Sequence, residues 1–155
     1  MIVEQRIKHV GEDGQSCNAG DHNVYVYVYD KDGNPLNGVI VHPLWGGEPD
    51  QVTGWKPEMP GGAVFGLWAP NPATNYTGNT GQQVKIIGDV NGRTYTSETS
   101  RVFYSAWPTI DDLWEGGYCA CLGFDYETCK WHLENFKHPF ARGHYSYIVK
   151  FKRTW

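Results

Sequence analysis

The sequence predicts an all-β protein, a β-sandwich of about seven strands folded as a single domain over residues 1–155. Its composition favours sheets, because only 19% of the residues are charged and 15% are aromatic, while 19 glycines and 9 prolines supply many turns. Short runs in which apolar and polar residues alternate recur between these turns, as in half-buried strands. A chain of this length buries one core rather than two.

The clearest strand is the segment NVYVYVYD, residues 23–30, in which valines alternate strictly with tyrosines. Successive side chains of a strand point to opposite faces, so this strand has a valine face and a tyrosine face. Asp32-Gly33 supplies the turn that follows, and Pro35 prevents the strand from continuing. A weaker alternation predicts an N-terminal strand over residues 2–10.

Five further strands follow between turn signals. Asn91-Gly92 stands between two alternating runs and predicts a β-hairpin. The final run carries aromatic and aliphatic residues on one face, as expected of a half-buried closing strand. These strands are predicted over residues 39–45, 63–68, 82–89, 93–105 and 144–155.

Residues 106–143 interrupt the alternation and are predicted to form a long insertion before the last strand. The helical period of about 3.6 residues is not sustained there over a stretch long enough to predict a helix. Three of the four cysteines lie in this insertion, so we expect disulfides to staple it.

The segment from residue 24 to about residue 90 resembles CnaB-like and carboxypeptidase-regulatory-like domains. The residues that carry the resemblance are VYVYVYDKDGNPLNGVIV, GGAVFGL, Tyr76 and VKII. These families are seven-stranded transthyretin-like domains, so the resemblance implies an immunoglobulin-like or prealbumin-like β-sandwich. Many CnaB domains form an isopeptide bond between a lysine of the first strand and an Asn or Asp of the last. Residues 23–30 contain no lysine and residues 144–155 contain neither Asn nor Asp, so that cross-link is not expected.

The whole arrangement is similar to accessory domains of secreted bacterial proteins, which often accompany glycoside hydrolases or other cell-envelope modules. The similarity lies in Cys17, shortly before the first strong strand, and in the closing segment GHYSYIVKFKRTW. It implies a non-catalytic, extracellular module that is part of a larger multidomain secreted protein.

The cysteines Cys17, Cys119, Cys121 and Cys129 allow either a zinc site or two disulfides. A zinc site would use the last three together with His132, a ligand set that tetrahedral zinc accepts. On an extended segment, however, the C-x-C spacing sends the two thiolates to opposite faces, and Cys17 would be left unused. We therefore favour disulfides, which use all four cysteines.

One of the three possible disulfide pairings needs a strained bond across a single residue, between Cys119 and Cys121. Two pairings remain: Cys17–Cys119 with Cys121–Cys129, and Cys17–Cys121 with Cys119–Cys129. We favour the first, because it closes residues 121–129 into a self-contained loop while Cys17 ties the start of the first strong strand to the insertion.

Composition and motifs argue against several classes of function. A net charge of −4 and a pI near 5.8 argue against binding to nucleic acid. No apolar run approaches the roughly 18 residues that span a bilayer, and the N-terminal MIVEQRIKHV lacks the pattern of a signal peptide. No catalytic motif occurs and no cofactor is expected. If a metal were bound, His132, His138 and His144 would be the residues to hold it.

Aromatic side chains are the candidate binding residues, because 7 tryptophans exceed what one core of this size needs. Exposed aromatic rings stack on the C–H faces of sugars, so we expect a polysaccharide or glycan as the partner; the alternative is burial within the fold. The candidates are the loop residues Trp55, Trp107 and Trp114, then Trp45 and Trp68, and the tyrosine face of Tyr25, Tyr27 and Tyr29.

Two other functions stay open. The first is a structural or adhesion module that spaces other domains and binds no small ligand, which complete burial of the aromatic rings would favour. The second is a small metal-dependent enzyme built around residues 119–144, which a metal held by the histidines would favour. Whether Trp107, Trp114 and Trp131 face solvent is therefore the question that the structure has to answer.

Overall fold

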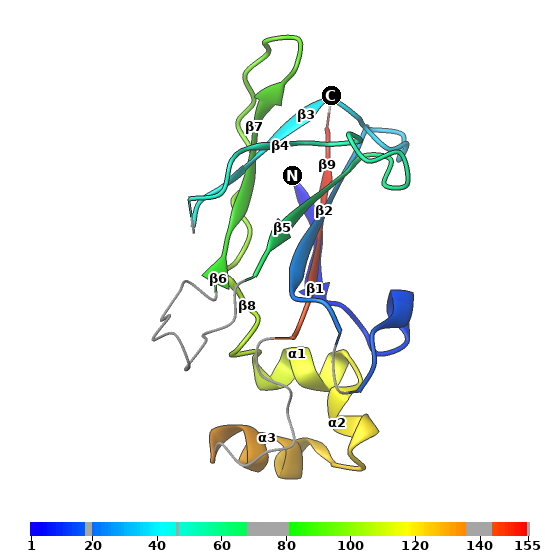
Figure 1. Ribbon diagram of the computed structural model, residues 1–155, viewed down its shortest axis with the longest axis vertical. Coiled ribbons are helices and arrows are strands. Elements are labelled where there is room, and N and C mark those ends of the chain that lie inside the picture. Colours follow the sequence, from blue (N-terminus) through cyan, green and yellow to red (C-terminus); the bar gives the residue numbers. More distant parts are fainter. Residues whose placement is uncertain (18–19, 46, 68–80, 136–143, 155) are drawn as a thin grey trace.

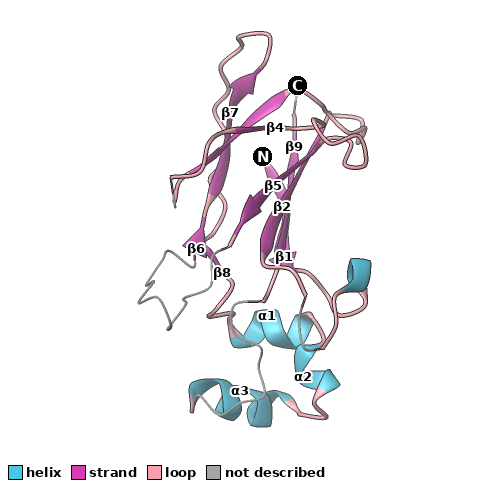
Figure 2. Ribbon diagram, viewed as in Figure 1, coloured by secondary structure: helices cyan, strands magenta, loops and turns pink. Residues whose placement is uncertain are grey.

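The computed structural model describes residues 1–17, 20–45, 47–67, 81–135 and 144–154. Within these ranges the helices gather at one end of the molecule, and residue 1 and the end of the last strand lie toward the other end (Figure 1). Figure 2 shows that strands and loops make up the rest. The elements are β1 (Ile2–Ile7), η1 (Glu12–Gly14), β2 (Asn23–Tyr29), β3 (Val39–Pro43), β4 (Gln51–Val52), β5 (Gly62–Gly66), β6 (Gly81–Gln82), β7 (Val84–Asp89), β8 (Phe103–Tyr104), α1 (Ile110–Glu115), α2 (Tyr118–Cys121), α3 (Tyr126–Glu134) and β9 (Tyr147–Lys152).

Four strands form the first sheet, in the order β1-β9-β2-β5. The strand β2 lies parallel to β9 and antiparallel to β5, and β1 lies antiparallel to β9. The alternation in β2 decides which face is buried: Val24, Val26 and Val28 are buried, whereas the three tyrosines that alternate with them are half-buried on the other face. The predicted alternation of valines and tyrosines is thus confirmed.

Three strands form the second sheet, in the order β4-β3-β7, and β6 pairs with β8. Val39 and Val41 of β3 and Val84 and Ile86 of β7 belong to the same buried cluster as the valines of β2. The two sheets therefore share one hydrophobic core, and the fold is rich in sheet, as the sequence predicts.

The turn at Asn91-Gly92 forms as predicted, but the predicted strand over residues 93–105 is wrong for most of its length. This stretch makes single bridges to β7, and only β8 pairs as a strand. Serine side chains take the place of backbone carbonyls here: Ser97 and Ser100 accept through Oγ from two amides of β7, at 2.8 and 3.0 Å. The sheet ladder is interrupted because side chains satisfy the strand amides.

The predicted insertion contains three short helices, which corrects the all-β prediction. The longest, α3, has 9 residues, too few to show a sustained helical period. Side-chain caps start two of them: Thr109 accepts from the amide of Asp112, and Asp125 accepts from the amide of Thr128 at 2.8 Å. Through buried residues such as Leu113, these helices close one end of the core.

Candidate binding surface

Two disulfides hold the helices in place: Cys17 is bonded to Cys121, and Cys119 to Cys129. Disulfides are therefore confirmed, but the favoured pairing of Cys17 with Cys119 and of Cys121 with Cys129 is wrong. The C-x-C pair lies on the helical turn α2, where side chains two residues apart diverge by about 200°. Cys119 points into the core, where Cys129 is also buried, and Cys121 points outward to the exposed Cys17.

The two bonds leave no free cysteine. The zinc site of Cys119, Cys121, Cys129 and His132 is therefore excluded in this oxidised form, because thiolates are the species that bind zinc. We call residues 107–135, which include all three helices, the stapled segment.

Ionic and hydrogen-bonding contacts also attach the stapled segment to the sheets. Arg101 donates from both terminal nitrogens to the buried carboxylate of Asp112, and its guanidinium lies over the rings of Phe103 and Tyr147, 5.1 and 5.6 Å from their centroids. Further along, the Tyr118 hydroxyl donates to a backbone carbonyl just after β1, at 2.7 Å. The segment is thus fixed at α1 and at α2.

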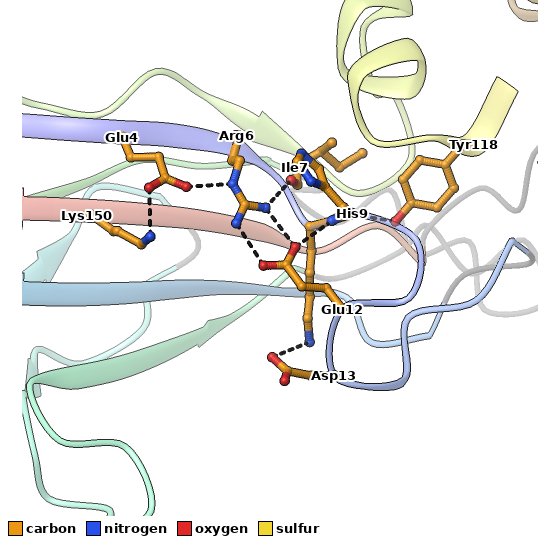
Figure 3. Close-up of polar contacts among 9 residues, drawn as sticks. Glu4, Arg6, Ile7, His9, Glu12, Asp13, Tyr118 and Lys150 are labelled. Carbon is orange, nitrogen blue, oxygen red and sulfur yellow. Dashed lines mark hydrogen bonds and ion pairs between the residues drawn. The ribbon is translucent and has the colours of Figure 1, made fainter. Parts of the chain in front are cut away.

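A network of charged side chains holds the N-terminal loop that carries Cys17, as Figure 3 shows. Arg6 donates two hydrogen bonds to the carboxylate of Glu12, at 2.8 and 2.7 Å, and Glu4 pairs with Lys150 at 2.7 Å. The hydrogen bonds from Arg6 lower the pKa of Glu12 to about 2. The loop is therefore tied to β1 by an ionised carboxylate.

Three tryptophans of the stapled segment keep about half of their surface in solvent: Trp107 is 47% exposed, Trp114 45% and Trp131 50%. Trp107 lies just before α1, Trp114 on α1 and Trp131 on α3. Trp131 is two residues from the buried Cys129 on the same helix, so its side chain points away from the core. It is a candidate that the sequence-based list of binding residues does not contain.

Neighbouring aromatic rings support these tryptophans. Trp114 packs edge-to-face on Tyr126, with ring centroids 5.7 Å apart, and the Tyr126 hydroxyl donates to Asp111 at 2.8 Å. Trp131 lies edge-on to His132, whose ring stacks on Phe124 at a centroid separation of 4.5 Å. Each of these two indoles therefore has one packed side and an accessible remainder.

The other tryptophan candidates, Trp45, Trp55 and Trp68, lie outside the stapled segment. Trp55 is 62% exposed, but it belongs to the loop between β4 and β5, and this loop lies toward the end of the molecule opposite the helices (Figure 1). Trp45 serves the fold instead: its indole donates to Gln83 at 2.9 Å, and its ring packs edge-to-face on Tyr104. Trp68 lies outside the described residues.

The tyrosine face of β2 consists of Tyr25, Tyr27 and Tyr29, all half-buried on the outer side of the first sheet. Tyr25 is the most engaged, because its hydroxyl donates to Asp21 at 2.8 Å and the ammonium of Lys8 lies 4.8 Å from its ring centroid. Burial raises the pKa of Tyr25 to about 12. The face is a ridge of partly covered rings, less accessible than the tryptophans of the stapled segment.

The histidine candidates do not converge on a metal site. His132 packs against the rings of Phe124 and Trp131. His144 lies edge-on to His22, with ring centroids 6.3 Å apart, and His138 falls outside the described residues. Among the residues that the structure describes, His, Cys, Asp and Glu form no group of three or more able to hold a metal ion.

Comparison with known proteins gives no relative: no family model, curated protein or solved structure matches the chain. In the described part of the chain, no helix is long and apolar enough to cross a membrane. The two disulfides are consistent with an extracellular protein, since such bonds persist in oxidising compartments.

Proposed function

We propose that this protein is a non-catalytic, extracellular binding module of the immunoglobulin-like or prealbumin-like sandwich type, and that it binds carbohydrate through Trp107, Trp114 and Trp131. One observation carries the proposal: three half-exposed tryptophans lie on a segment that one disulfide ties to the loop before β2 and a second disulfide closes internally. A preorganised surface binds at a lower entropic cost than a flexible one.

The exposure of these rings has an energetic cost that a ligand would offset. An indole that keeps about half of its surface in water forgoes on the order of 2–3 kcal/mol of burial free energy. Single exposed apolar residues are ordinary, but several large ones on a rigid segment of about 30 residues are typical of a contact surface. Sugar rings present flat C–H faces that match an indole, and carboxylates such as Asp111 are available for hydroxyl groups nearby.

Attachment to a larger secreted protein would make a weak site useful. A few stacking contacts give modest affinity, but tethering raises the effective concentration of the module at a surface with many repeated sugars. Polysaccharide is therefore a better partner for this surface than a free small sugar.

A pull-down panel of insoluble polysaccharides tests the proposal. We expect at least one polysaccharide to retain the native protein and to lose it when Trp107, Trp114 and Trp131 are all changed to alanine. Trp55→Ala is the matched control, because Trp55 is at least as exposed but belongs to the loop between β4 and β5, away from the stapled segment. If the triple variant is retained as strongly as the native protein, carbohydrate binds at a different surface. If no polysaccharide retains the native protein, the carbohydrate proposal is rejected.

The second candidate is a structural or adhesion module without a small ligand. It is favoured by the edge-to-face packing of Trp114 on Tyr126, which shows that this ring also contributes to the fold of the segment. If this alternative is correct, changing the three tryptophans lowers stability and no glycan is retained.

A further inference from the structure

The tryptophans of the stapled segment lie on the part of the chain that carries its negative charge. Of the 17 acidic and 13 basic residues of the chain, residues 107–135 contain six and one, and the remaining 11 and 12 nearly cancel. One of the six carboxylates, that of Asp112, is buried and paired with Arg101. The other five residues are exposed: Asp111, Glu115, Asp125, Glu127 and Glu134.

On α3, carboxylates stand beside the exposed indole of Trp131. Glu127 lies four residues before Trp131 and Glu134 three residues after it, so both are its neighbours along the helix surface. A helical side chain leans toward the turn before it, which directs the indole toward Glu127. The single lysine of the segment, Lys130, lies 4.0 Å from Glu134 and offsets at most one of the exposed charges.

On α1, a carboxylate lies beside Trp114 in the same way. Asp111 precedes Trp114 by three residues, and it accepts a hydrogen bond from Tyr126, whose ring packs edge-to-face on Trp114. Because Tyr126 belongs to α3, this contact joins the two acidic helices into one surface at the end of the molecule where the helices gather (Figure 1). Each of the two indoles thus has a carboxylate within one helical turn.

An exposed aromatic ring beside a carboxylate suits an organic cation. An ammonium group is attracted by the face of an indole and by a carboxylate, and the two attractions act together. The same surface repels an anionic sugar, and a neutral sugar offers the carboxylates no opposite charge. The charge of the segment therefore selects among the glycans that could stack on its tryptophans.

We propose that the stapled segment binds a polysaccharide whose sugars carry protonated amino groups, such as a polymer of glucosamine. Sugar rings stack on Trp114 and Trp131, and ammonium groups lie beside Asp111 and Glu127. The inference rests on the proposed function, because it names the class of glycan for the same surface. Exposed cation–π contacts and ion pairs are individually weak, and one of each together predicts a preference of about tenfold over the neutral sugar.

The test compares three soluble hexasaccharides of β-1,4-linked sugars that differ only at carbon 2: those of glucosamine, N-acetylglucosamine and glucose. Isothermal titration calorimetry of the native protein measures each affinity in mildly acidic buffer of low ionic strength, in which glucosamine is protonated. We expect the glucosamine hexamer to bind about tenfold more tightly than the other two. This advantage should disappear at high salt, because salt screens exposed charges.

Two variants of equal charge change separate the carboxylates from the rings. Asp111→Asn/Glu127→Gln should weaken binding of the glucosamine hexamer about tenfold and leave the affinity for the glucose hexamer within about twofold. Asp32→Asn/Glu58→Gln is the matched control, because it removes two exposed carboxylates from loops outside the stapled segment, and it should change neither affinity.

Equal affinity for the glucosamine and glucose hexamers would overturn this inference and leave the carbohydrate proposal in place. Unchanged glucosamine affinity in Asp111→Asn/Glu127→Gln would overturn it too. Equally tight binding of hexalysine would replace the inference by recognition of a basic peptide. Undiminished glucosamine binding by the triple tryptophan variant would assign the ligand to another surface. If none of the hexamers binds, the inference is rejected, and the pull-down panel decides the proposed function by itself.

Discussion

Cys17 and Cys121 are joined by a disulfide across 104 residues of sequence, with Cα atoms 5.7 Å apart. The bond links the loop before β2 to α2, and so it attaches the stapled segment to the N-terminal part of the first sheet. Cys17 is exposed and Cys121 half-buried, so the bond contributes through the length of chain that it closes rather than through packing.

Changing Cys17 and Cys121 together to serine should lower the free energy of unfolding by about 4–5 kcal/mol, because a loop of roughly 100 residues regains its entropy in the unfolded chain. Urea unfolding of the oxidised protein, followed by circular dichroism, measures the effect. A loss below about 1 kcal/mol would show that the segment is held by its other contacts.

The ion pair between Arg101 and Asp112 should be worth more than an exposed pair. Asp112→Ala leaves a half-buried guanidinium beside aromatic rings without its carboxylate, and we expect a loss of about 2–4 kcal/mol in the free energy of unfolding. Glu134→Gln, which removes the exposed partner of Lys130 on α3, is the control and should cost less than about 0.5 kcal/mol. Similar values for the two variants would contradict the anchoring role of Arg101.

Protonation of Glu12 should lower the stability of the protein in acid. Its pKa is lowered from 4.5 to about 2 by the hydrogen bonds from Arg6, so the folded state favours the carboxylate. The contribution of Glu12 to the free energy of unfolding is complete above pH 4.5, which is the pKa of this group in the unfolded chain. It disappears as the pH falls through about 2, the pKa in the folded state. Thermal melts of native protein and Glu12→Gln should differ at pH 6 and converge near pH 2. A difference independent of pH would mean that the charge of Glu12 is not involved.

Two tryptophans of different environment should respond differently to the same substitution. Trp45→Phe removes an indole hydrogen bond to Gln83 and an aromatic contact, so we expect a loss of about 1–2 kcal/mol. Trp55→Phe should change stability by less than about 0.5 kcal/mol, because this side chain is largely exposed. Denaturant unfolding of both variants checks the assignment, and an equal loss would contradict it.

The strands that carry the core could be predicted from the sequence because their alternation depends only on local side-chain direction. The segment over residues 23–30 shows this most clearly, since its valines are buried and its tyrosines are half-buried as expected. The stretch over residues 93–105 could not be predicted correctly, because two amides of β7 donate to the hydroxyl groups of Ser97 and Ser100 instead of to backbone carbonyls of this stretch. A pattern of apolar and polar residues does not report which polar atom accepts a hydrogen bond.

The candidate site was harder to predict for a similar reason. The choice between the two disulfide pairings depends on whether Cys119 and Cys121 lie on a strand or on a helix, and α2 is only 4 residues long. Whether a tryptophan is free to serve a ligand or is used by the fold depends on contacts with residues distant in sequence, such as the hydrogen bond from Trp45 to Gln83. Trp131 could have been found by assuming a helix, since it stands two positions from a buried cysteine.

Affinity electrophoresis tests the binding surface most directly, in native gels that contain a soluble form of the polysaccharide identified by the pull-down panel. We expect the native protein and Trp55→Ala to be retarded equally, whereas the variant in which Trp107, Trp114 and Trp131 are alanine should migrate as it does without polysaccharide. A folded triple variant that is retarded as strongly as the native protein would contradict the claim that the stapled segment is the binding surface.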